Sequence, residues 1–196
     1  YNSFGALVQS AWLMSFERRN GTLEMVFLSP ANRMAIIYGW ALGALFQNIW
    51  MFLIFAVFVT IYFNGIPLAH LLYLPLVFLL LTLSAMIWGG LMNVIFMFSR
   101  DAGILFNVFD EPMSLFSGVR VPTAVFPLWA KAISVIFPLT HTLVIVRSLL
   151  IRGSLADSLP SLGYLVAVCA LMIVLTRIIL DKAEKHGRET GNFSFY

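Results

Sequence analysis

Long uncharged runs alternate along this chain with short charged or proline-containing segments. No Asp, Glu, Lys or Arg occurs among the 66 residues between Arg33 and Arg100. A helix that spans a membrane needs about 20 apolar residues. The stretch therefore predicts two spans, at 34–63 and 71–98, joined by a turn at Asn64–Pro67.

The rest of the chain continues this pattern. Apolar runs predict further spans at 104–121 and 158–180. The uncharged residues 1–16 are too short for a full span, so we interpret them as a partial span whose beginning precedes the given sequence. Two other segments, 17–33 and the tail 181–196, are polar and together hold 11 of the 21 charged residues.

The run 122–152 is apolar but does not fit a simple span. Pro127 and Pro138 interrupt it, and Lys131 would be costly inside a bilayer. Lys and Arg concentrate on cytoplasmic flanks, so we place 17–33 inside the cell. A crossing at 122–152 would then leave the basic tail outside. The sequence therefore predicts that 122–152 enters the membrane from outside and returns, as a re-entrant helix pair at about 124–137 and 139–151.

Composition supports a membrane protein. Hydrophobic residues make up 61% of the chain and charged residues 11%, whereas soluble domains are near half apolar and a quarter charged. The net charge of +3 is small. The basic residues lie at the edges of apolar runs rather than in one patch, which argues against nucleic-acid binding. The single cysteine, Cys169, excludes a disulfide within the chain. We expect an all-α, polytopic integral membrane helical bundle forming one transmembrane domain, 1–196.

The charged segment 17–33 contains a bend at Gly21 followed by a short helix ending at Ser29-Pro30. In this helix Leu23, Val26 and Phe27 fall at positions i, i+3 and i+4, which places them on one apolar face. Such a helix could dock into a groove of a cytosolic partner. The alternative is a solvated loop that only obeys the positive-inside rule.

Asp110 and Glu111 lie inside the predicted span 104–121. A carboxylate within the bilayer should face protein or a water-filled cavity. The pair could line a translocation path or bind a cationic substrate. Alternatively, it could lie near the cytoplasmic headgroups, paired with Arg100, and anchor the helix.

Three strings, in order, carry a resemblance to a known family. The first is Glu17-Arg18-x-x-Gly21-Thr22-Leu23-Glu24, and the second combines Phe116-Ser117-Gly118, Pro122 and Phe126-Pro127-Leu128-Trp129. The third combines Pro138-Leu139-Thr140-His141 with Arg147-Ser148-Leu149-Leu150. Together they resemble type-2 ABC export permeases, the group that includes daunorubicin-type drug exporters. His141, where the family often has Tyr, and the missing first span are departures.

The resemblance implies a six-span permease fold, lacking its first span here, with an extracellular re-entrant pair. Two permeases would pair, as homo- or heterodimer, with two cytosolic ATP-binding subunits. Those subunits would bind ATP and Mg, and this chain would need no cofactor. The chain would lie in the plasma membrane, as a multi-pass protein of a prokaryotic inner membrane, with lipid around it. A drug, lipid, peptide or glycan would move outward between the permeases.

The resemblance also assigns roles to residues. Contact with the ATPase would involve Glu17, Arg18, Gly21, Thr22, Leu23, Glu24, Val26 and Phe27. Candidate path residues are Asp110, Glu111, Ser117 and Gly118. The re-entrant region would be marked by Pro122, Pro127, Pro138, Thr140, His141 and Arg147.

Two other classes of function remain. An intramembrane enzyme would have to use Asp110, Glu111 or His141, but the chain has no H-E-x-x-H or G-x-S-x-G motif. A channel or structural membrane protein would need no ATPase. The chain itself has no phosphate-binding G-x-x-x-x-G-K-[ST] loop, so ATP chemistry would have to come from a partner.

Overall fold

The computed structural model describes residues 12–22, 25–26, 29–62, 72–99, 101–153 and 156–190. Within these ranges all regular structure is helical and no strand occurs, which confirms the expected all-α class. The longer helices are α2 (Leu13–Arg19), α4 (Arg33–Tyr62), α5 (Leu74–Met97), α6 (Ala102–Phe116), α7 (Leu128–Ser134), α8 (Pro138–Arg147) and α9 (Leu159–Thr190). Short 3₁₀ turns, η3 (Thr123–Val125) and η5 (Ala156–Ser158), and a π-helical turn, η4 (Ser148–Arg152), connect them.

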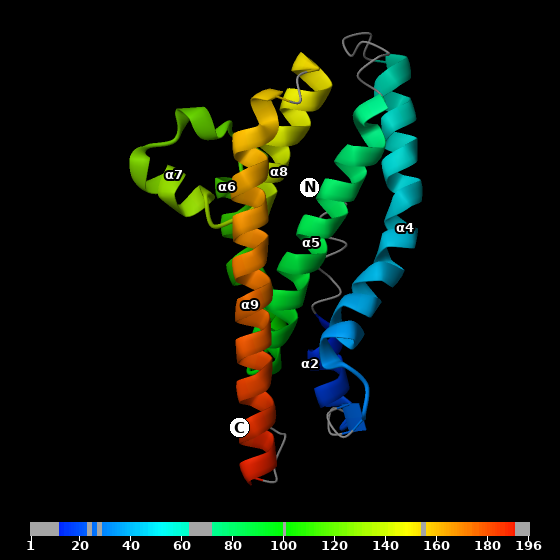
Figure 1. Ribbon diagram of the computed structural model, residues 1–196, viewed down its shortest axis with the longest axis vertical. Helices are drawn as coiled ribbons and strands as arrows, with labels where there is room; N and C mark the ends of the chain where they lie inside the picture. The colour runs from blue at the N-terminus through cyan, green and yellow to red at the C-terminus, as the bar shows by residue number, and fades with distance from the viewer. Residues whose placement is uncertain are drawn as a thin grey trace.

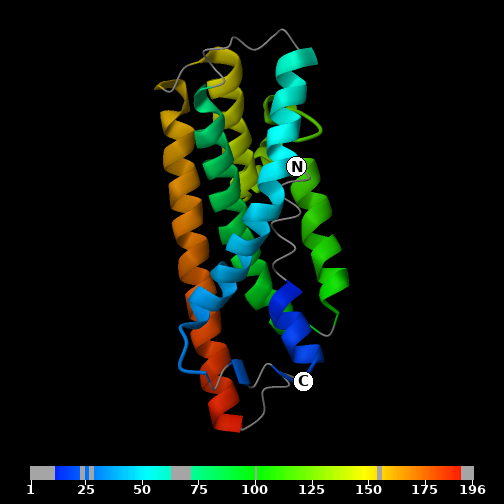
Figure 2. The ribbon, with the colours of Figure 1, turned by 90° about the vertical axis from the view of Figure 1, so that its right-hand side faces the viewer.

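The long helices run up and down in an elongated bundle (Figures 1 and 2). α5 lies at its centre and packs against α2, α4, α8 and α9. One end of the bundle, here called the α2 end, gathers α2 and the C-terminal ends of α5 and α9. The other, the η4 end, carries the tip of α8 and the start of α9.

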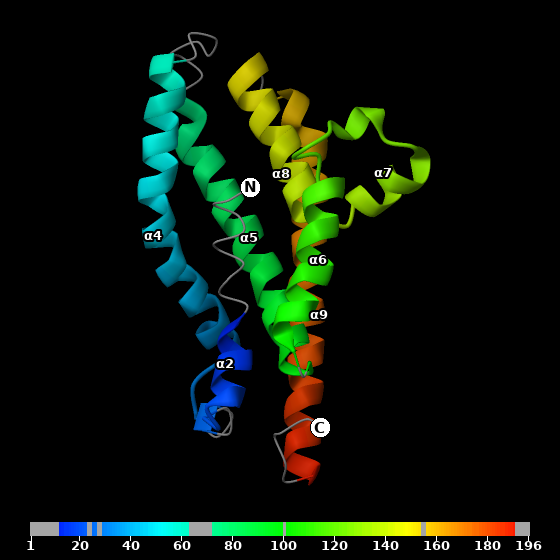
Figure 3. The ribbon, with the colours of Figure 1, turned by 180° about the vertical axis from the view of Figure 1, so that it is seen from behind.

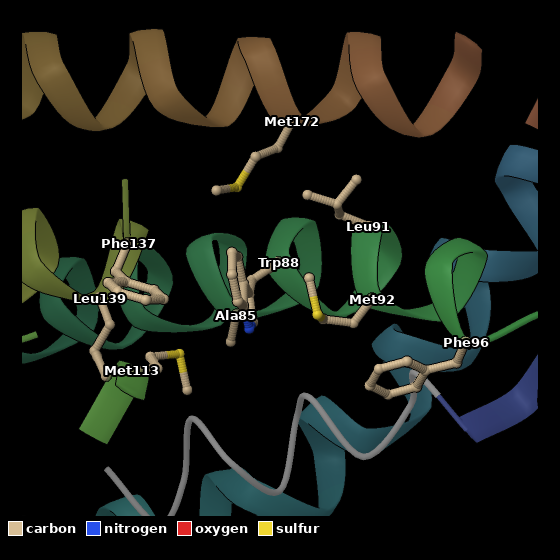
Figure 4. Close-up of a cluster of buried hydrophobic side chains, with 9 residues drawn as sticks. All are labelled: Ala85, Trp88, Leu91, Met92, Phe96, Met113, Phe137, Leu139 and Met172. Atoms are coloured by element: carbon tan, nitrogen blue, oxygen red, sulfur yellow. The ribbon is translucent and has the colours of Figure 1, made fainter. Parts of the chain in front are cut away.

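Large apolar side chains form both the inside and the outside of this bundle. The main core cluster gathers around Trp88, Met92 and Phe96 of α5, with Met113 of α6 and Met172 of α9 (Figure 4). Many apolar side chains instead point outward. Examples are Trp50, Ile54, Ile61, Val166, Leu171 and Val174. An apolar surface this extensive, on α4 and α9 alike, is that of a protein surrounded by lipid or partner subunits.

Two helices within the described ranges are long and apolar enough to cross a membrane. They are Leu74–Met97 and the continuous stretch Ala156–Lys185. A third span would count if α7 and Pro138–Ile151, which meet at a bend of 96°, were one broken span. Another apolar helical stretch, Ile49–Phe58, lies within α4.

α4 and α5 approach closely at Gly90. A Cβ on Gly90 would lie 2.6 Å from the ring carbon Cε1 of Tyr38, so only glycine leaves room for the ring. Small residues at helix interfaces allow such approaches in membranes. Gly39 and Gly43 on α4 have the spacing of small residues that can allow close packing. At Gly39 and Gly43 an added Cβ would instead meet nothing within 4 Å.

α6 is shorter than the span expected at 104–121. It begins at the cap Asp101, whose carboxylate accepts from the backbone N–H groups of Gly103 and Ile104. It ends at Phe116, because Gly118 adopts a left-handed φ of 85° that a helix cannot continue through. Its 15 residues reach only about 22 Å, less than the hydrocarbon thickness of roughly 30 Å.

The segment after α6 leaves the bundle and returns. η3 and α7 stand away from the other helices (Figure 3), and α8 then runs back along α5 and α9. Each proline here begins an element, as its fixed φ and missing N–H favour. Pro122 precedes η3, Pro127 precedes α7, and Pro138 is the first residue of α8. The helices are shorter than the expected 124–137 and 139–151, but the break falls between them as expected.

Candidate functional site

α2 ends in a Schellman motif built from the first family string. The N–H of Thr22 donates to the carbonyl of Glu17 at 3.0 Å, and the N–H of Gly21 donates to that of Arg18 at 3.1 Å. Gly21 has the left-handed φ of 71° that this motif needs at its turn position. The Thr22 hydroxyl also donates to the Glu17 carboxylate. Glu17, Gly21 and Thr22 thus fix the bend after α2.

Arg18 ties this bend to the end of α5. Its guanidinium Nη1 donates to the carbonyl of Met97, and Nη2 donates to that of Ser99. These carbonyls lie at the C-terminus of α5, where helix carbonyls lack internal partners and the helix dipole favours a cation. Arg18 therefore caps α5 from another segment of the chain.

An aromatic cluster reinforces the same junction. The ring of Trp12, just before α2, lies 6.5 Å from that of Phe96 and 5.8 Å from that of Phe106, between ring centroids. Phe96 and Phe106 are themselves in edge contact at 6.5 Å. The cluster joins the start of α2 to α5 and α6. α2 is therefore attached to the bundle at two points, through Trp12 and through Arg18.

Val26 continues the attachment to the bundle. It packs against a buried cluster formed by Ile37 of α4, Val94 and Met97 of α5, and Leu180 and Ala183 of α9. The apolar face expected to dock on a partner is thus turned toward the chain's own core at Val26. Met25, beside it, is 65% exposed. The other predicted contact residues, Leu23, Glu24 and Phe27, lie outside the described residues.

An ion pair that the sequence pattern did not indicate closes the α2 end. Arg33, at the start of α4, binds Glu184 near the end of α9. Both side chains are largely shielded, at 20% and 17% exposure. α9 continues helically to Thr190, so part of the expected tail 181–196 extends this helix. The α2 end is therefore one connected unit of α2, α4, α5 and α9.

The acidic pair lies on α6, roughly 12 Å along the helix from its start. Asp110 is half-buried and Glu111 is exposed. Neighbouring helical residues point about 100° apart, so the two carboxylates face different surroundings. Arg100, the partner in the anchoring alternative, lies outside the described residues.

Two groups of predicted residues meet where α6 ends. The guanidinium Nη2 of Arg147, on α8, donates to the carbonyl of Gly118 at 2.7 Å. A candidate path residue is thereby bound to a candidate re-entrant residue. Ser117 beside it is 1% exposed, and its hydroxyl has no hydrogen-bond partner within the described structure.

The first turn of α8 brings buried polar groups into the middle of the bundle. His141 Nε2 is 3.0 Å from the carbonyl of Val135, and its ring stacks on that of Tyr164 of α9 at 5.8 Å. Thr142 donates to Ser84 of α5 at 3.2 Å. Thr140 is buried, with no partner for its hydroxyl within the described residues. Thr142, Ser84 and Tyr164 were not among the predicted site residues.

The described residues show no constellation for metal chemistry. Among them, no group of three or more His, Cys, Asp or Glu side chains could hold a metal ion. The polar groups instead form tethers between helices.

Comparison with known protein families identifies the family of this chain. A sequence-family profile described as ABC-2 type transporter matches residues 3–151. The match includes the bend after α2, all of α6 and α7, and α8. Searches of curated proteins and of solved structures give no significant match to this chain. The matched region covers most of the chain and contains the three motif strings, and the chain therefore belongs to the ABC-2 type transporter family of membrane permeases.

Proposed function

We propose that this chain is the transmembrane permease subunit of an ATP-driven exporter and that its α2 end receives the movement of cytosolic ATP-binding subunits. The observation that carries the proposal is the tether of Arg18 to the carbonyls of Met97, the last residue of α5, and of Ser99 just after it. A loop that only marked topology would need no such attachment. A segment that transmits force must be fixed to the helices it moves.

The route of the movement follows the contacts at the α2 end. A push on the exposed side of the bend would pass through Arg18 and Trp12 into α5 and α6. Through Val26 it would reach α4 and α9, which the Arg33–Glu184 pair holds together. The bend would thus displace several helices together rather than one alone.

Substrate would move along α6 and the re-entrant pair α7–α8, in a cavity shared with a second permease subunit. α6 presents Asp110 half-buried and Glu111 exposed, which suits one carboxylate facing the shared path and one facing a neighbour. α7 exposes Leu128 and Trp129 at 85% and 62%, as an element that meets lipid or another subunit would. Direction of transport is outward, and the class of cargo is a drug, lipid, peptide or glycan.

In this proposal the α2 end lies in the cytosol and the η4 end outside, and the protein resides in the plasma membrane of a prokaryotic cell. Two ATP-binding subunits per complex would carry ATP and Mg, and each would meet one permease at Met25 and its neighbours. The exposure of Met25 beside the buried contacts of Val26 supports this choice of contact point.

Cross-linking from position 25 tests the proposal. Replacing Cys169 by alanine removes the only cysteine of the sequence, and Met25→Cys then adds one at the α2 end. In membranes of the native host, a thiol-to-amine cross-linker should join position 25 to a protein with an ATP-binding phosphate loop, identified by mass spectrometry.

The matched control is Val125→Cys in η3, which is 74% exposed on the other side of the proposed membrane. It should give no product with the ATPase. A product from position 125 and none from position 25 would reverse the orientation. If neither position gives a cross-linked product with an ATPase although both variants are expressed normally, the proposal of a partner ATPase is contradicted.

A further inference from the structure

The segment between α6 and α8 exposes a set of large apolar side chains. They are Val125 in η3, Leu128 and Trp129 in α7, and Val135 and Ile136 just after α7. η3 and α7 stand away from the other helices, nearer to the η4 end than to the α2 end (Figure 3). We call the segment 120–136 the excursion. An exposed apolar surface of this kind marks a contact with a membrane or with another protein.

α7 turns one side toward the bundle and an apolar side away from it. Ala130 and Ser134, about one turn apart, are buried. Leu128 and Val135 are exposed and lie seven residues apart, so they share the outward side. Lys131 is exposed at the edge of that side. An apolar side flanked by a long cationic side chain is typical of a helix on a membrane surface, where the charged end reaches the headgroups.

Packing contacts hold the excursion in place. The ring of Phe116, at the end of α6, lies 6.3 Å from that of Phe126 and 5.9 Å from that of Trp129, between ring centroids. At the root of the excursion, Arg147 of α8 donates to the carbonyl of Gly118 at 2.7 Å. The outward side chains are therefore presented by a packed structure.

The charges of this region all have one sign. The 45 residues from 112 to 156 contain no Asp or Glu. Their basic residues are Arg120, Lys131, Arg147 and Arg152. Arg120 and Lys131 are exposed on the excursion, and Arg147 is exposed at its root. Short segments outside the membrane normally carry few Lys and Arg, so cations without a compensating acid indicate an anionic partner here.

We infer that the excursion lies on the outer leaflet of the membrane and selects anionic phospholipids, such as phosphatidylglycerol. Val125 and Leu128 would enter the upper acyl-chain region, and Trp129 would lie at the headgroup level that tryptophan favours. Arg120 and Lys131 would contact the phosphate groups. The leaflet rests on the orientation proposed above, whereas the preference for anionic lipid does not.

A second copy of this chain does not match the same surface. In a symmetric dimer the excursion would meet itself. Arg120 and Lys131 would then face identical cations, with no acid between residues 112 and 156 to offset them. A soluble anionic partner would match the cations but not the outward Leu128, which is 85% exposed. An anionic lipid surface matches both features.

Quenching by spin-labelled lipids measures which lipids adjoin the excursion. Leu128→Cys in a Cys169→Ala background is labelled with a fluorophore, and the purified permease is placed in phosphatidylcholine nanodiscs. Phosphatidylglycerol or phosphatidylcholine with a doxyl quencher high on its acyl chain is included at the same small mole fraction. The apparent association constant of phosphatidylglycerol should be more than about tenfold the larger, because each basic residue near an anionic surface contributes roughly a factor of five.

Charge variants and salt identify the cause of this preference. Lys131→Gln and Arg120→Gln should each lower the ratio of the two constants about fivefold. Sodium chloride at about 1 M, where the Debye length is about 3 Å, should lower the ratio in the protein with both cations. Arg177→Gln, which removes an exposed cation of α9, should leave the ratio unchanged. A fluorophore at Val166→Cys, an exposed apolar position of α9, should be quenched equally by both lipids.

Equal quenching by the two lipids at position 128 would overturn the selection of anionic lipid. Quenching by neither, or a disulfide between two copies at this position, would show that the outward side of α7 meets something other than lipid and would also overturn the inference. If a charge variant loses its thermal transition, the two constants of the protein with both cations, and their salt dependence, decide the outcome. Since no ATPase is present, failure here leaves the exporter proposal untouched, and failure of cross-linking at position 25 leaves lipid selection untouched.

Discussion

Replacing Arg18 by methionine should uncouple the permease from its ATPase and lower permease-stimulated ATP hydrolysis about tenfold or more. The change removes two hydrogen bonds from a charged donor to the carbonyls of Met97 and Ser99. Each such bond contributes roughly 1.5–3 kcal/mol, and about 1.4 kcal/mol is a factor of ten in an equilibrium. The bend after α2 would then move without α5. ATP hydrolysis by the reconstituted complex measures the effect.

Arg19→Met is the matched control for this variant. Arg19 is the next residue of α2 and is exposed, so both variants remove one positive charge from the same flank and disturb topology equally. Only Arg18→Met should uncouple. Equal activities of the two variants would show that the contact of Arg18 with the end of α5 has no part in coupling.

A second large effect is expected on stability from Gly118→Ala. An alanine with a φ of 85° costs about 1–2 kcal/mol, and its Cβ would lie 2.9 Å from Cγ2 of Thr123, which adds about 1–3 kcal/mol of overpacking. The free energy of unfolding should therefore fall by about 2–5 kcal/mol. Thermal unfolding of the purified permease measures it.

Gly21→Ala separates the two contributions. Gly21 has a similar φ of 71°, but an added Cβ there meets nothing within 4 Å, so only the backbone penalty remains. The double variant Gly118→Ala/Thr123→Ser lacks the clashing methyl and should recover the difference. If Gly118→Ala and Gly21→Ala destabilise equally, the close contact with Thr123 is not a constraint.

The helices were predictable where composition alone decides them. Uncharged runs gave α4 at 33–62 and α5 at 74–97, close to the expected 34–63 and 71–98. The proline at 138 placed the break between α7 and α8, because proline begins a helix and cannot continue one. Gly21 marked a bend, and the structure has one there. The helix before it continues to Arg19, however, and does not end at Phe16 as expected.

The tethers were not predictable because their partners are distant in the chain. Arg18 binds carbonyls 79 and 81 residues away, and Arg33 binds a carboxylate 151 residues away. A backbone carbonyl has no sequence signature, so the role of Arg18 could not be separated from that of Arg19. The contact that the Val26 side chain makes could not be predicted either. An apolar helical face can pack on a partner or on the chain's own core, and only the tertiary structure decides between them.

The length of α6 shows the limit of hydropathy. The run 104–121 has only three charged residues, Asp110, Glu111 and Arg120, and its other residues are mostly apolar, so the sequence predicted one span there. The turn at Gly118 ended the helix earlier. The string Phe116-Ser117-Gly118 carried that signal, since a glycine after a helical run favours a left-handed end.

The central claim is that ATP binding by the partner at the α2 end changes the exposure of the proposed path beside α6. The most direct test measures how fast a cysteine at position 117 is labelled, in the variant Ser117→Cys with Cys169→Ala. The permease is purified with its ATP-binding subunit and reconstituted, and the labelling rate with a membrane-impermeant maleimide is compared with and without ATP and vanadate. Ser117 is 1% exposed in the structure. Our account predicts that nucleotide changes the rate at least about fivefold, the lower end of typical coupling between sites, and that Arg18→Met abolishes the change. A labelling rate that is the same with and without ATP, in a complex that hydrolyses ATP, would contradict it.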